Sequence, residues 1–328
     1  MKIAIVGGTG NISTSIVKLL LEQGHDVTCV NRGIRGELPK DVRLIKGDRQ
    51  DRKWFEEAMQ KEKFDAAIDM ICYTAEDAVS SLAAFRGTGH FIHTSTVVTY
   101  GSEFKWFPVT EDHPLRAENS YGKLKVECDK IFLEAYYREG FPVTILKPST
   151  TYGPKRILRQ LGLDTTWVNR IRKGKPILQL GDGKAIHHLL YVDDAAKGFV
   201  GALGKEHCIG QVYNIVNPQY TDWETYHRTA MKVLGKEVEL VGVPAKILIS
   251  INEEKFAMTR DIFSHNCFYC SIKIQRDIPE FKPEVSLEEG LRRSFEYIDE
   301  EGLVENSDEQ TWEDRIIEAQ HQVAMIRF

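Results

Sequence analysis

A glycine-rich loop near the start of the chain constrains its fold more than any other feature. The Gly-Gly-Thr-Gly run at residues 7–10 directly follows an apolar segment, Lys2–Val6, and leads into a segment with helical periodicity, Ser13–Gln23. A second apolar segment, Val27–Asn31, comes at the spacing of a βαβ unit. Such a turn brings backbone amides close to a pyrophosphate at the positive end of a helix. We therefore expect a dinucleotide-binding domain to begin here.

The alternation of strand and helix continues through the first half of the chain. Further strands are expected at Val42–Lys46, Ala66–Met70, Phe91–Thr94 and Val143–Lys147. A long helix is expected from Tyr121 to about Glu139, where Gly140 supplies a stop signal. This order predicts an α/β fold of the Rossmann type, in which helices wrap a doubly wound parallel sheet.

A smaller C-terminal lobe is expected beyond this domain. Glycine and proline become frequent after residue 153, and an extended segment at Val238–Val243 lies among further helical stretches. We assign residues 1–152 and about 188–216 to the dinucleotide-binding domain. The substrate lobe then comprises residues 153–187 and 217–299, and residues 300–328 form a helical tail.

The tail carries an apolar stripe at helical spacing. Its members follow one another at steps of four, three, four and three: Trp312, Ile316, Ala319, Val323 and Ile326. Thr311 and Asp314 offer a capping pair in front of the stripe. We expect this helix to dock on the parent fold, and a homodimer contact is the alternative.

The composition limits the kinds of binding partner and the cellular compartment that we expect for this chain. The net charge of −5 arises from well-mixed signs, so it gives no electrostatic reason to expect nucleic acid or an anionic membrane as a partner. No apolar run approaches the roughly 18 residues of a membrane span. The cysteines lack framework spacing, and Cys267 and Cys270 lack the second pair that a structural zinc site needs. We expect a reduced, cytoplasmic protein that acts on a small molecule without a metal.

Tyr121 and Lys125 form a candidate proton-transfer pair. Residues at i and i+4 share a helix face, and a lysine ammonium beside a phenol favours the phenolate. Tyr269 and Lys273 have the same spacing. Only the first pair follows a glycine loop and the strands of a nucleotide-binding domain, so we interpret the second as a chance match.

The end of the second strand bears on the choice of cofactor. Asn31 and Arg32 stand where an NAD-binding domain usually has an acidic residue for the ribose 2′-hydroxyl. Arg32 would attract a 2′-phosphate, which favours NADP, whereas a merely solvated Arg32 leaves NAD as the alternative. Asp48, after the third strand, is placed to accept a hydrogen bond from an adenine amino group.

The glycine loop, Asp48 and the Tyr121–Lys125 pair, in this order along the chain, resemble the motifs of the extended short-chain dehydrogenases/reductases, the NAD(P)-dependent epimerase/dehydratase family. The glycine loop keeps Gly7 and Gly10 and has Ser13 at the third glycine position. Other segments similar to family signatures are Thr94–Gly101, Leu146–Pro154 and Tyr191–Ala195. The resemblance covers residues 1 to about 298. The segments 31–33 and 47–49 are also similar to an atypical branch related to chloroplast stem-loop RNA-binding proteins.

The resemblance implies a role for each matching residue. Tyr121 is the general acid/base, Lys125 binds the nicotinamide ribose and stabilises the phenolate, and Thr96 bonds the substrate, with Ser95 as the weaker candidate. The implied cofactor contacts are Gly7, Thr9, Gly10, Asn11, Ile12, Asn31, Arg32, Asp48, Arg49, Ile71, Thr94, Tyr121, Lys125 and Pro148. The candidate substrate contacts are Cys72, Tyr73, Thr150, Trp167 and His187.

Two departures from the family pattern narrow the expected reaction. Val97 and Val98 stand where dehydratases of this family place an Asp-Glu pair, which argues against that elimination. His187 stands where nucleotide-sugar enzymes carry an arginine that pairs with the diphosphate, and a neutral imidazole is a poor substitute.

We therefore expect an oxidoreductase or epimerase that acts by hydride transfer on a hydroxyl or carbonyl of a sugar-like substrate, nucleotide sugars included. Three alternatives stay open. The chain could be an NADPH-dependent reductase of a non-sugar carbonyl, an RNA-binding or non-catalytic member of the fold, or a redox-sensing regulator with a vestigial site.

Overall fold

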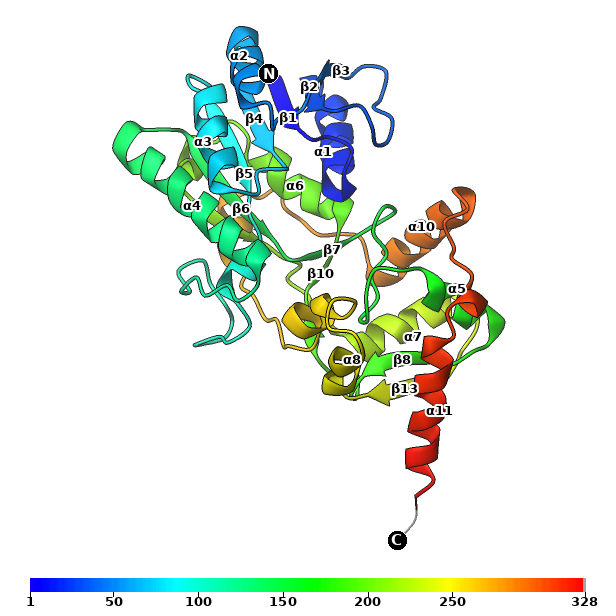
Figure 1. Ribbon diagram of the computed structural model, residues 1–328. Helices are drawn as coiled ribbons and strands as arrows, with labels where there is room; N and C mark the ends of the chain where they lie inside the picture. Colours follow the sequence, from blue (N-terminus) through cyan, green and yellow to red (C-terminus); the bar gives the residue numbers. More distant parts are fainter. Residues whose placement is uncertain (327–328) are drawn as a thin grey trace. The chain divides into compact units, whose positions relative to one another are not determined.

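The computed structural model describes residues 1–326 of the 328-residue chain, which divides into two compact units. The first unit contains residues 1–151, 192–218 and 269–284. The second contains residues 152–191, 219–268 and those from 285 onward. Figure 1 labels the helices and strands of both.

The first unit is built on a seven-stranded sheet in which the neighbouring strands run parallel. The strand order is β11-β6-β5-β4-β1-β2-β3, so the order reverses between β1 and β4. Ligands of doubly wound sheets bind outside the carboxyl ends of the strands at such a reversal. The predicted Rossmann-type fold is confirmed. The strands are β1 (Lys2–Val6), β2 (Asp26–Asn31), β3 (Arg43–Lys46), β4 (Ala66–Asp69), β5 (His90–Thr94), β6 (Val143–Pro148) and β11 (Val212–Ile215).

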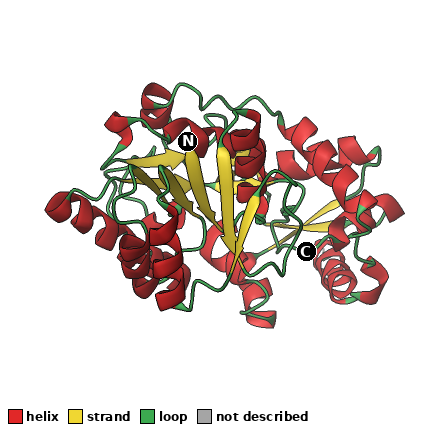
Figure 2. Cartoon of the chain, turned by 90° about the horizontal axis from the view of Figure 1, so that it is seen from above, coloured by secondary structure: helices red, strands yellow, loops and turns green. Residues whose placement is uncertain are grey.

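Helices cover both faces of this sheet (Figure 2). α1 packs with α6, while α2, α3 and α4 pack in succession. Beneath the latter group lies an aromatic core with ring centroids 5.2–6.0 Å apart, formed by Phe55, Phe85, Phe91 and Phe132. This dry core fixes α4 against the sheet. The helices are α1 (Asn11–Glu22), α2 (Arg52–Glu62), α3 (Ala75–Ala84), η1 (Val97–Tyr100), α4 (Ser120–Glu139), α6 (Val192–Ala202), η2 (Glu206–Cys208) and α9 (Ile272–Asp277).

The unit boundaries differ from the predicted ones in two places. Residues 269–284 belong to the first unit rather than to the substrate lobe, because Tyr269 forms a β-bridge with Val109 and α9 packs on β11. Residues 188–191 belong to the second unit, which also includes the tail, rather than to the dinucleotide-binding domain. Neither difference has a local sequence signal, since both depend on contacts between distant segments.

The second unit is assembled from short strand pairs and helices. β8 pairs in parallel with β13, and β9 pairs antiparallel with β12. The core around β8 and β13 is mainly aliphatic, with Phe256 among its buried members, and includes Leu178, Leu180, Val241, Val243 and Leu248. Within residues 1–326, no helix is both long and apolar enough to cross a membrane. The elements are β7 (Thr150–Tyr152, which leads in from the first unit), α5 (Thr166–Lys173), β8 (Ile177–Leu180), β9 (Ile186–His187), β10 (Leu189–Tyr191), β12 (Thr221–Asp222), α7 (Trp223–Leu234), β13 (Leu240–Val243), α8 (Ala245–Ile251), the π-helical η3 (Thr259–Phe263), α10 (Leu287–Glu300), η4 (Ser307–Glu309) and α11 (Trp312–Ala324).

The tail forms the predicted helix, α11, which docks through Trp312 and Ile316 of the predicted stripe, whereas the C-terminal end of the stripe does not dock. Glu313 and Ile317 are buried, whereas Val323 and Ile326, both expected in the docking stripe, are exposed. Thr311 has helical dihedral angles and makes no capping hydrogen bond through its side chain, so the predicted capping pair is wrong. The dimer alternative for the exposed end stays a prediction.

A buried ion cluster explains which face of α11 docks. Glu313 accepts hydrogen bonds from the Arg159 guanidinium at 2.6 Å and from the backbone N–H of Leu178 at 3.1 Å. Arg159 also pairs with Asp164 at 2.9 Å. A buried charge needs such partners, so Glu313 is buried between α11 and the core next to Trp312 and Ile316, although the predicted stripe does not include it.

Replacing Glu313 with glutamine is expected to lower the free energy of unfolding by about 1.5–3 kcal/mol, the range for hydrogen bonds to charged groups. The loss stays below that of a fully unpaired charge because Arg159 keeps Asp164. Chemical denaturation would measure it. The matched control is Glu318→Gln, at an exposed position of the same helix, which should change stability by no more than about 0.5 kcal/mol. Equal effects of the two variants would contradict the assignment.

Candidate active site

The glycine loop joins β1 to α1 in a conformation that needs glycine. Gly7 and Gly8 have φ angles of 116° and 97°, which other residues rarely adopt. A Cβ on Gly8 would also lie 2.4 Å from the Cys29 sulfur. The loop is tied by a hydrogen bond from the backbone N–H of Gly10 to Ser13 Oγ, at 2.8 Å. Ser13 thus closes the turn from the third glycine position.

Asn11, the first residue of α1, shows how the loop fits a dinucleotide. Both polar atoms of its side chain are shielded from solvent without a hydrogen-bond partner in the described structure. A buried amide without a partner is costly, and a ligand at the positive end of α1 would satisfy it. The predicted contacts Thr9 and Ile12 are half-buried beside it. The loop therefore fits a pyrophosphate.

Asn31 and Arg32 take different roles at the end of β2. The Asn31 side chain donates to the Gly7 carbonyl and accepts from the Gly33 N–H, both at 2.7 Å, so it braces the loop. Arg32 lies 3.9 Å from Asp48, and both side chains are about half exposed. An exposed pair at this distance is weak. The Arg32 guanidinium therefore stays available to an anionic group.

The Arg49 side chain, which was predicted to contact the cofactor, bonds to other groups of the protein. Its buried guanidinium pairs with Asp69 at 2.8 Å and also donates to Ser81 and to the Asp77 carbonyl. These contacts tie the turn after β3 to the end of β4. Arg49 thus supports the site through its neighbour Asp48 rather than through an exposed guanidinium.

Tyr121 and Lys125 lie on the first turns of α4, as predicted. Lys125 is only 1% exposed, and its ammonium donates to the carbonyls of Cys72 and Thr94, both at 2.7 Å. These carbonyls follow β4 and end β5, so the lysine is anchored at the carboxyl edge of the sheet. Burial lowers the pKa of Lys125. Tyr121 is 43% exposed and so is accessible to a substrate.

The Ser95–Thr96 pair leads from β5 into η1. Ser95 is committed to the interior, since its hydroxyl donates to Asp129 at 2.9 Å. Thr96 accepts from the Val98 N–H at 3.2 Å and keeps its hydroxyl proton for another partner. Gly122 allows α4 to approach η1, because a Cβ there would lie 3.1 Å from the Val98 carbonyl. Thr96 is therefore better placed than Ser95 to bond a substrate.

A buried charge network, absent from the sequence predictions, lies behind this pair. Asp129 of α4 forms an ion pair with Lys147 of β6, and both are almost fully buried. Lys147 also donates to Thr99 of η1 at 2.7 Å, and His93 lies 3.3 Å from Asp129. Burial lowers the pKa of His93, and the neighbouring Asp129 carboxylate opposes this shift. The network links β5, β6, η1 and α4.

Other predicted cofactor contacts lie at the carboxyl ends of neighbouring strands. Ile71, half-buried, follows β4, and its N–H donates to Asp69 at 3.0 Å. Thr94 ends β5 and its hydroxyl donates to Met70 sulfur at 3.2 Å, while Pro148 ends β6 and is buried. Their placement agrees with a ligand at this edge of the sheet.

The predicted substrate contacts separate into accessible and buried groups. Tyr73 is exposed and Thr150 is half-buried. Cys72 is buried 3.9 Å from the Cys128 sulfur, and Trp167 is buried against Tyr226, His227 and Phe295. His187 is buried against Trp223 and Phe263, and burial lowers its pKa to about 3. Three of the predicted substrate contacts thus pack in the interior as uncharged side chains: Cys72, Trp167 and His187.

The second Tyr–Lys spacing does not form a comparable pair. Lys273 belongs to α9, whereas Tyr269 precedes that helix and is buried. Lys273 donates instead to the Val212 carbonyl at 2.9 Å. The two residues therefore do not share a helical turn. In the described part of the chain, no three His, Cys, Asp or Glu side chains are grouped to hold a metal ion.

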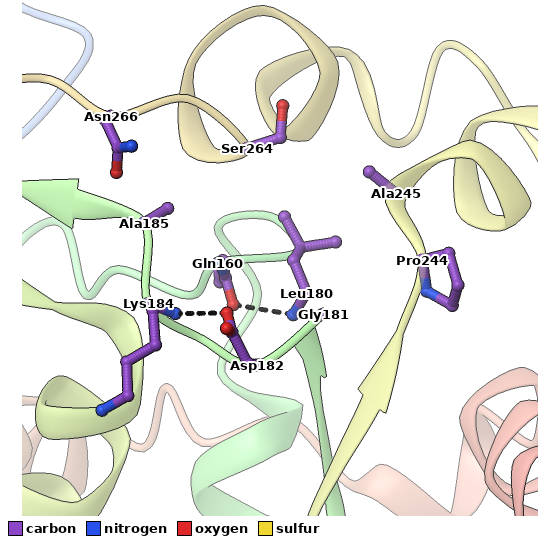
Figure 3. A pocket seen from close by; sticks show the side chains of 10 residues that line it. All are labelled: Gln160, Leu180, Gly181, Asp182, Lys184, Ala185, Pro244, Ala245, Ser264 and Asn266. Carbon is purple, nitrogen blue, oxygen red and sulfur yellow. Dashed lines mark hydrogen bonds between the residues drawn. The ribbon is translucent and has the colours of Figure 1, made fainter.

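The second unit contains a hollow of about 430 Å³ with a mixed lining (Figure 3). Gln160 is buried there; its side-chain oxygen accepts from the Leu180 N–H at 2.8 Å, and its amide nitrogen has no partner among the described residues. The Asp182 carboxylate accepts from the Lys184 N–H at 2.9 Å. The lining of the hollow comprises Gln160, Leu180, Gly181, Asp182, Lys184, Ala185, Pro244, Ala245, Ser264 and Asn266.

Comparison with known proteins identifies the family. The model of the NAD dependent epimerase/dehydratase family matches residues 3–216, which include the glycine loop, the Tyr121–Lys125 pair and all seven strands of the sheet. The chain belongs to this epimerase/dehydratase family. The expected enzyme class is thereby confirmed.

Two curated relatives cover most of the chain. The chloroplast stem-loop binding protein of 41 kDa b from Arabidopsis thaliana is 26% identical over 90% of this chain and 78% of its own length. The 2′-dehydrokanamycin reductase of Streptomyces kanamyceticus is 26% identical over 75% of this chain and 70% of its own length. Relatives at the same identity to this chain thus carry names that describe unlike functions.

Solved structures confirm the family fold. The UDP-glucose 4-epimerase of Thermotoga maritima, solved with UDP-glucose, has a TM-score of 0.74 at 22% identity and covers 92% of this chain and 99% of its own. The UDP-glucuronic acid 4-epimerase of Bacillus cereus, solved with UDP-glucuronic acid and NAD, has a TM-score of 0.73 at 21% identity over 92% and 99%.

Proposed function

We propose that this chain catalyses NAD(P)-dependent hydride transfer at a hydroxyl or carbonyl carbon of a sugar-like substrate, with Tyr121 as the proton acceptor and donor. One observation carries the proposal: an accessible Tyr121 lies on the same helix face as a buried Lys125 that is anchored to the carboxyl edge of a Rossmann sheet. A proton-transfer group beside a dinucleotide site is what alcohol oxidation and carbonyl reduction require.

Different residues of the chain would transfer the proton, bind the substrate and hold the dinucleotide. Tyr121 takes the proton from the substrate hydroxyl, and the Lys125 cation favours the phenolate that does so. Thr96 supplies a hydroxyl that holds the substrate oxygen. A bound nicotinamide supplies the hydride acceptor or donor. The dinucleotide would be held by Gly7, Asn11, Arg32 and the turn after β3 that contains Asp48.

A dehydratase reaction has little support at this site. Elimination of water needs groups that deliver and remove protons next to Thr96. Val97, which is buried, and Val98, which is half-buried, fill those positions, and neither carries a titratable group. Simple redox chemistry at one carbon, or epimerisation through a keto intermediate, needs only Tyr121, Lys125 and Thr96.

Arg32 favours NADP as the cofactor, with NAD as the alternative. Replacing Arg32 with glutamine is expected to weaken NADPH binding by about tenfold or more, because a charge-assisted contact to the 2′-phosphate is lost. Binding of NADH should not change. Titration of nicotinamide fluorescence would measure both constants. An unaltered protein that binds NADH more tightly than NADPH would overturn the assignment.

The substrate is proposed to be a sugar or sugar-like alcohol, and two forms must be distinguished. Relatives solved with UDP-sugars favour a nucleotide-linked substrate, whereas the kanamycin-type reductase favours a free glycoside. His187 supports the second form, because a buried neutral imidazole offers no cation to a diphosphate. Activity on a panel of paired free and nucleotide-linked sugars would decide between them.

Turnover with and without added cofactor separates the two reaction types. An epimerase that retains its dinucleotide regenerates it in each cycle and turns over without addition. A reductase stalls after one equivalent. A protein inactive on the whole panel with either dinucleotide would count against the proposal.

One alternative function has a specific observation in its favour. One relative that covers 90% of this chain, at 26% identity, is a stem-loop binding protein. RNA binding would predict a shifted stem-loop RNA at physiological salt and no effect of Tyr121→Phe on that shift.

A further inference from the structure

Tyr73 lies against the proposed proton-transfer pair although it is not part of it. The Lys125 ammonium is 4.8 Å from the centroid of the Tyr73 ring and 5.9 Å from that of Tyr121. The two rings are 6.4 Å apart and tilted by 53°. Both distances to the cation fall within the roughly 6 Å range of a cation–π contact. The ammonium is thus flanked by two aromatic rings.

The Tyr73 ring is held by the same backbone that anchors the lysine. The carbonyl of Cys72 accepts the Lys125 hydrogen bond, and the N–H of Tyr73 donates to Asp77 at 3.0 Å. Asp77 is fixed in turn by Arg52 at 3.0 Å. The ring therefore sits on a braced turn at the start of α3, so its position over the lysine is built into the fold.

The exposures of the three side chains indicate what the ring does. Lys125 is 1% exposed, whereas Tyr73 is 45% exposed. One part of the Tyr73 ring therefore faces solvent while its inner face covers the ammonium. A charge kept out of water acts more strongly on its neighbours, because the effective dielectric constant between them is lower. Burial raises the pKa of Tyr73, so this second phenol stays neutral and is no rival base.

We propose that Tyr73 is a positioning residue whose ring shields the Lys125 ammonium from water and so keeps its charge effective on the Tyr121 phenol. The inference rests on the proton-transfer role of Tyr121 proposed above.

Removal of the ring would have two opposing effects. Water reaching Lys125 would screen its charge and make the Tyr121 phenolate harder to form. Water reaching Tyr121 would stabilise the phenolate. The first effect is the larger, because Tyr121 is already 43% exposed whereas Lys125 has almost no contact with solvent. Tyr73→Ala should therefore move the ionisation of Tyr121 to higher pH.

A substrate-free titration tests this directly. Phenolate absorbance in the near ultraviolet is followed against pH, and the curve of Tyr121→Phe is subtracted to isolate Tyr121. The same subtraction is made in the Tyr73→Ala and Tyr73→Phe backgrounds. The midpoint should shift to higher pH for Tyr73→Ala and stay in place for Tyr73→Phe, which keeps the ring. Tyr73→Leu, which keeps apolar cover without a π face, should shift it less than alanine does.

The activity profile gives a second readout. At neutral pH, Tyr73→Ala should lower kcat/KM by about tenfold, with recovery as the pH rises. Tyr137→Ala, at an exposed position of the same helix as Lys125, should change neither readout. Unchanged midpoints in Tyr73→Ala and Tyr73→Leu, with an inactive Tyr121→Phe, would overturn this inference alone. An active Tyr121→Phe would instead overturn the proposed function.

Discussion

Replacing Tyr121 with phenylalanine is expected to lower kcat/KM by about 100- to 10,000-fold, the usual contribution of a positioned general acid or base. The ring stays, so the contact with Tyr73 and the start of α4 should be preserved. Only the proton carrier is lost. Stability should therefore change little, and thermal unfolding of the variant would verify that. Steady-state kinetics on the preferred sugar would measure the loss.

Tyr269→Phe is the matched comparison for this change. Tyr269 also has a lysine four residues on, but the pair does not share a helix, and Lys273 is bonded elsewhere. The variant should keep kcat/KM within a few-fold of the parent. Similar losses in both variants would mean that a phenol hydroxyl matters for folding rather than for chemistry.

Replacing Asp129 with asparagine is expected to lower the free energy of unfolding by about 3–5 kcal/mol, the range for a broken buried ion pair. The variant leaves the Lys147 ammonium buried beside neutral groups, namely the asparagine amide and the hydroxyls of Ser95 and Thr99. This loss of stability is expected to exceed that of Glu313→Gln. In Glu313→Gln, Arg159 still pairs with the Asp164 carboxylate, whereas in Asp129→Asn no second carboxylate pairs with Lys147 in the described structure. Chemical denaturation would measure it.

The surface pair on the same helix provides the control for Asp129. Glu134 and Arg138 are 2.9 Å apart and largely exposed. Glu134→Gln should change stability by no more than about 0.5 kcal/mol. A double variant, Asp129→Asn with Lys147→Met, should recover part of the loss, because it removes the unpaired charge. No recovery would show that the loss arises from packing instead.

Asp129 also predicts how stability depends on pH. Burial by itself would raise the pKa of Asp129, but the Lys147 ammonium and His93 lower it from 3.8 to about 2. A carboxylate with a depressed folded-state pKa stabilises the fold above its unfolded pKa and loses this contribution as the pH falls through the folded value. The parent should thus lose stability between about pH 4 and pH 2 more steeply than Asp129→Asn.

Features with local sequence signals were predictable. The glycine loop, the first six strands and the end of α4 at Gly140 follow from residue types and spacing that act within a few positions. The Tyr121–Lys125 pair is equally local, since both residues lie on one helix. Conformational preference and periodicity suffice for such features.

Features that depend on pairing across the chain were not predictable. Lys147 lies inside a buried strand and Glu313 lies among other charged residues at the start of α11, and no neighbouring residue indicates Asp129 or Arg159 as the partner. The resemblance implied a cofactor contact for Arg49, and its pairing with Asp69 was not predictable because Asp69 lies on another strand. For Lys147 alone, a charged residue in an otherwise apolar strand was the available signal. Such a residue indicates a buried ion pair, but the sequence does not show which residue is its partner.

Deuterium transfer tests the central claim most directly. The parent protein is incubated with the sugar panel and reduced dinucleotide carrying deuterium at the transferable position, and the sugars are examined by mass spectrometry. We predict deuterium on the carbon that bears the reacting oxygen, with transfer greatly slowed in Tyr121→Phe. Chemical conversion of a sugar without any label at that carbon would contradict hydride transfer as the function of this site.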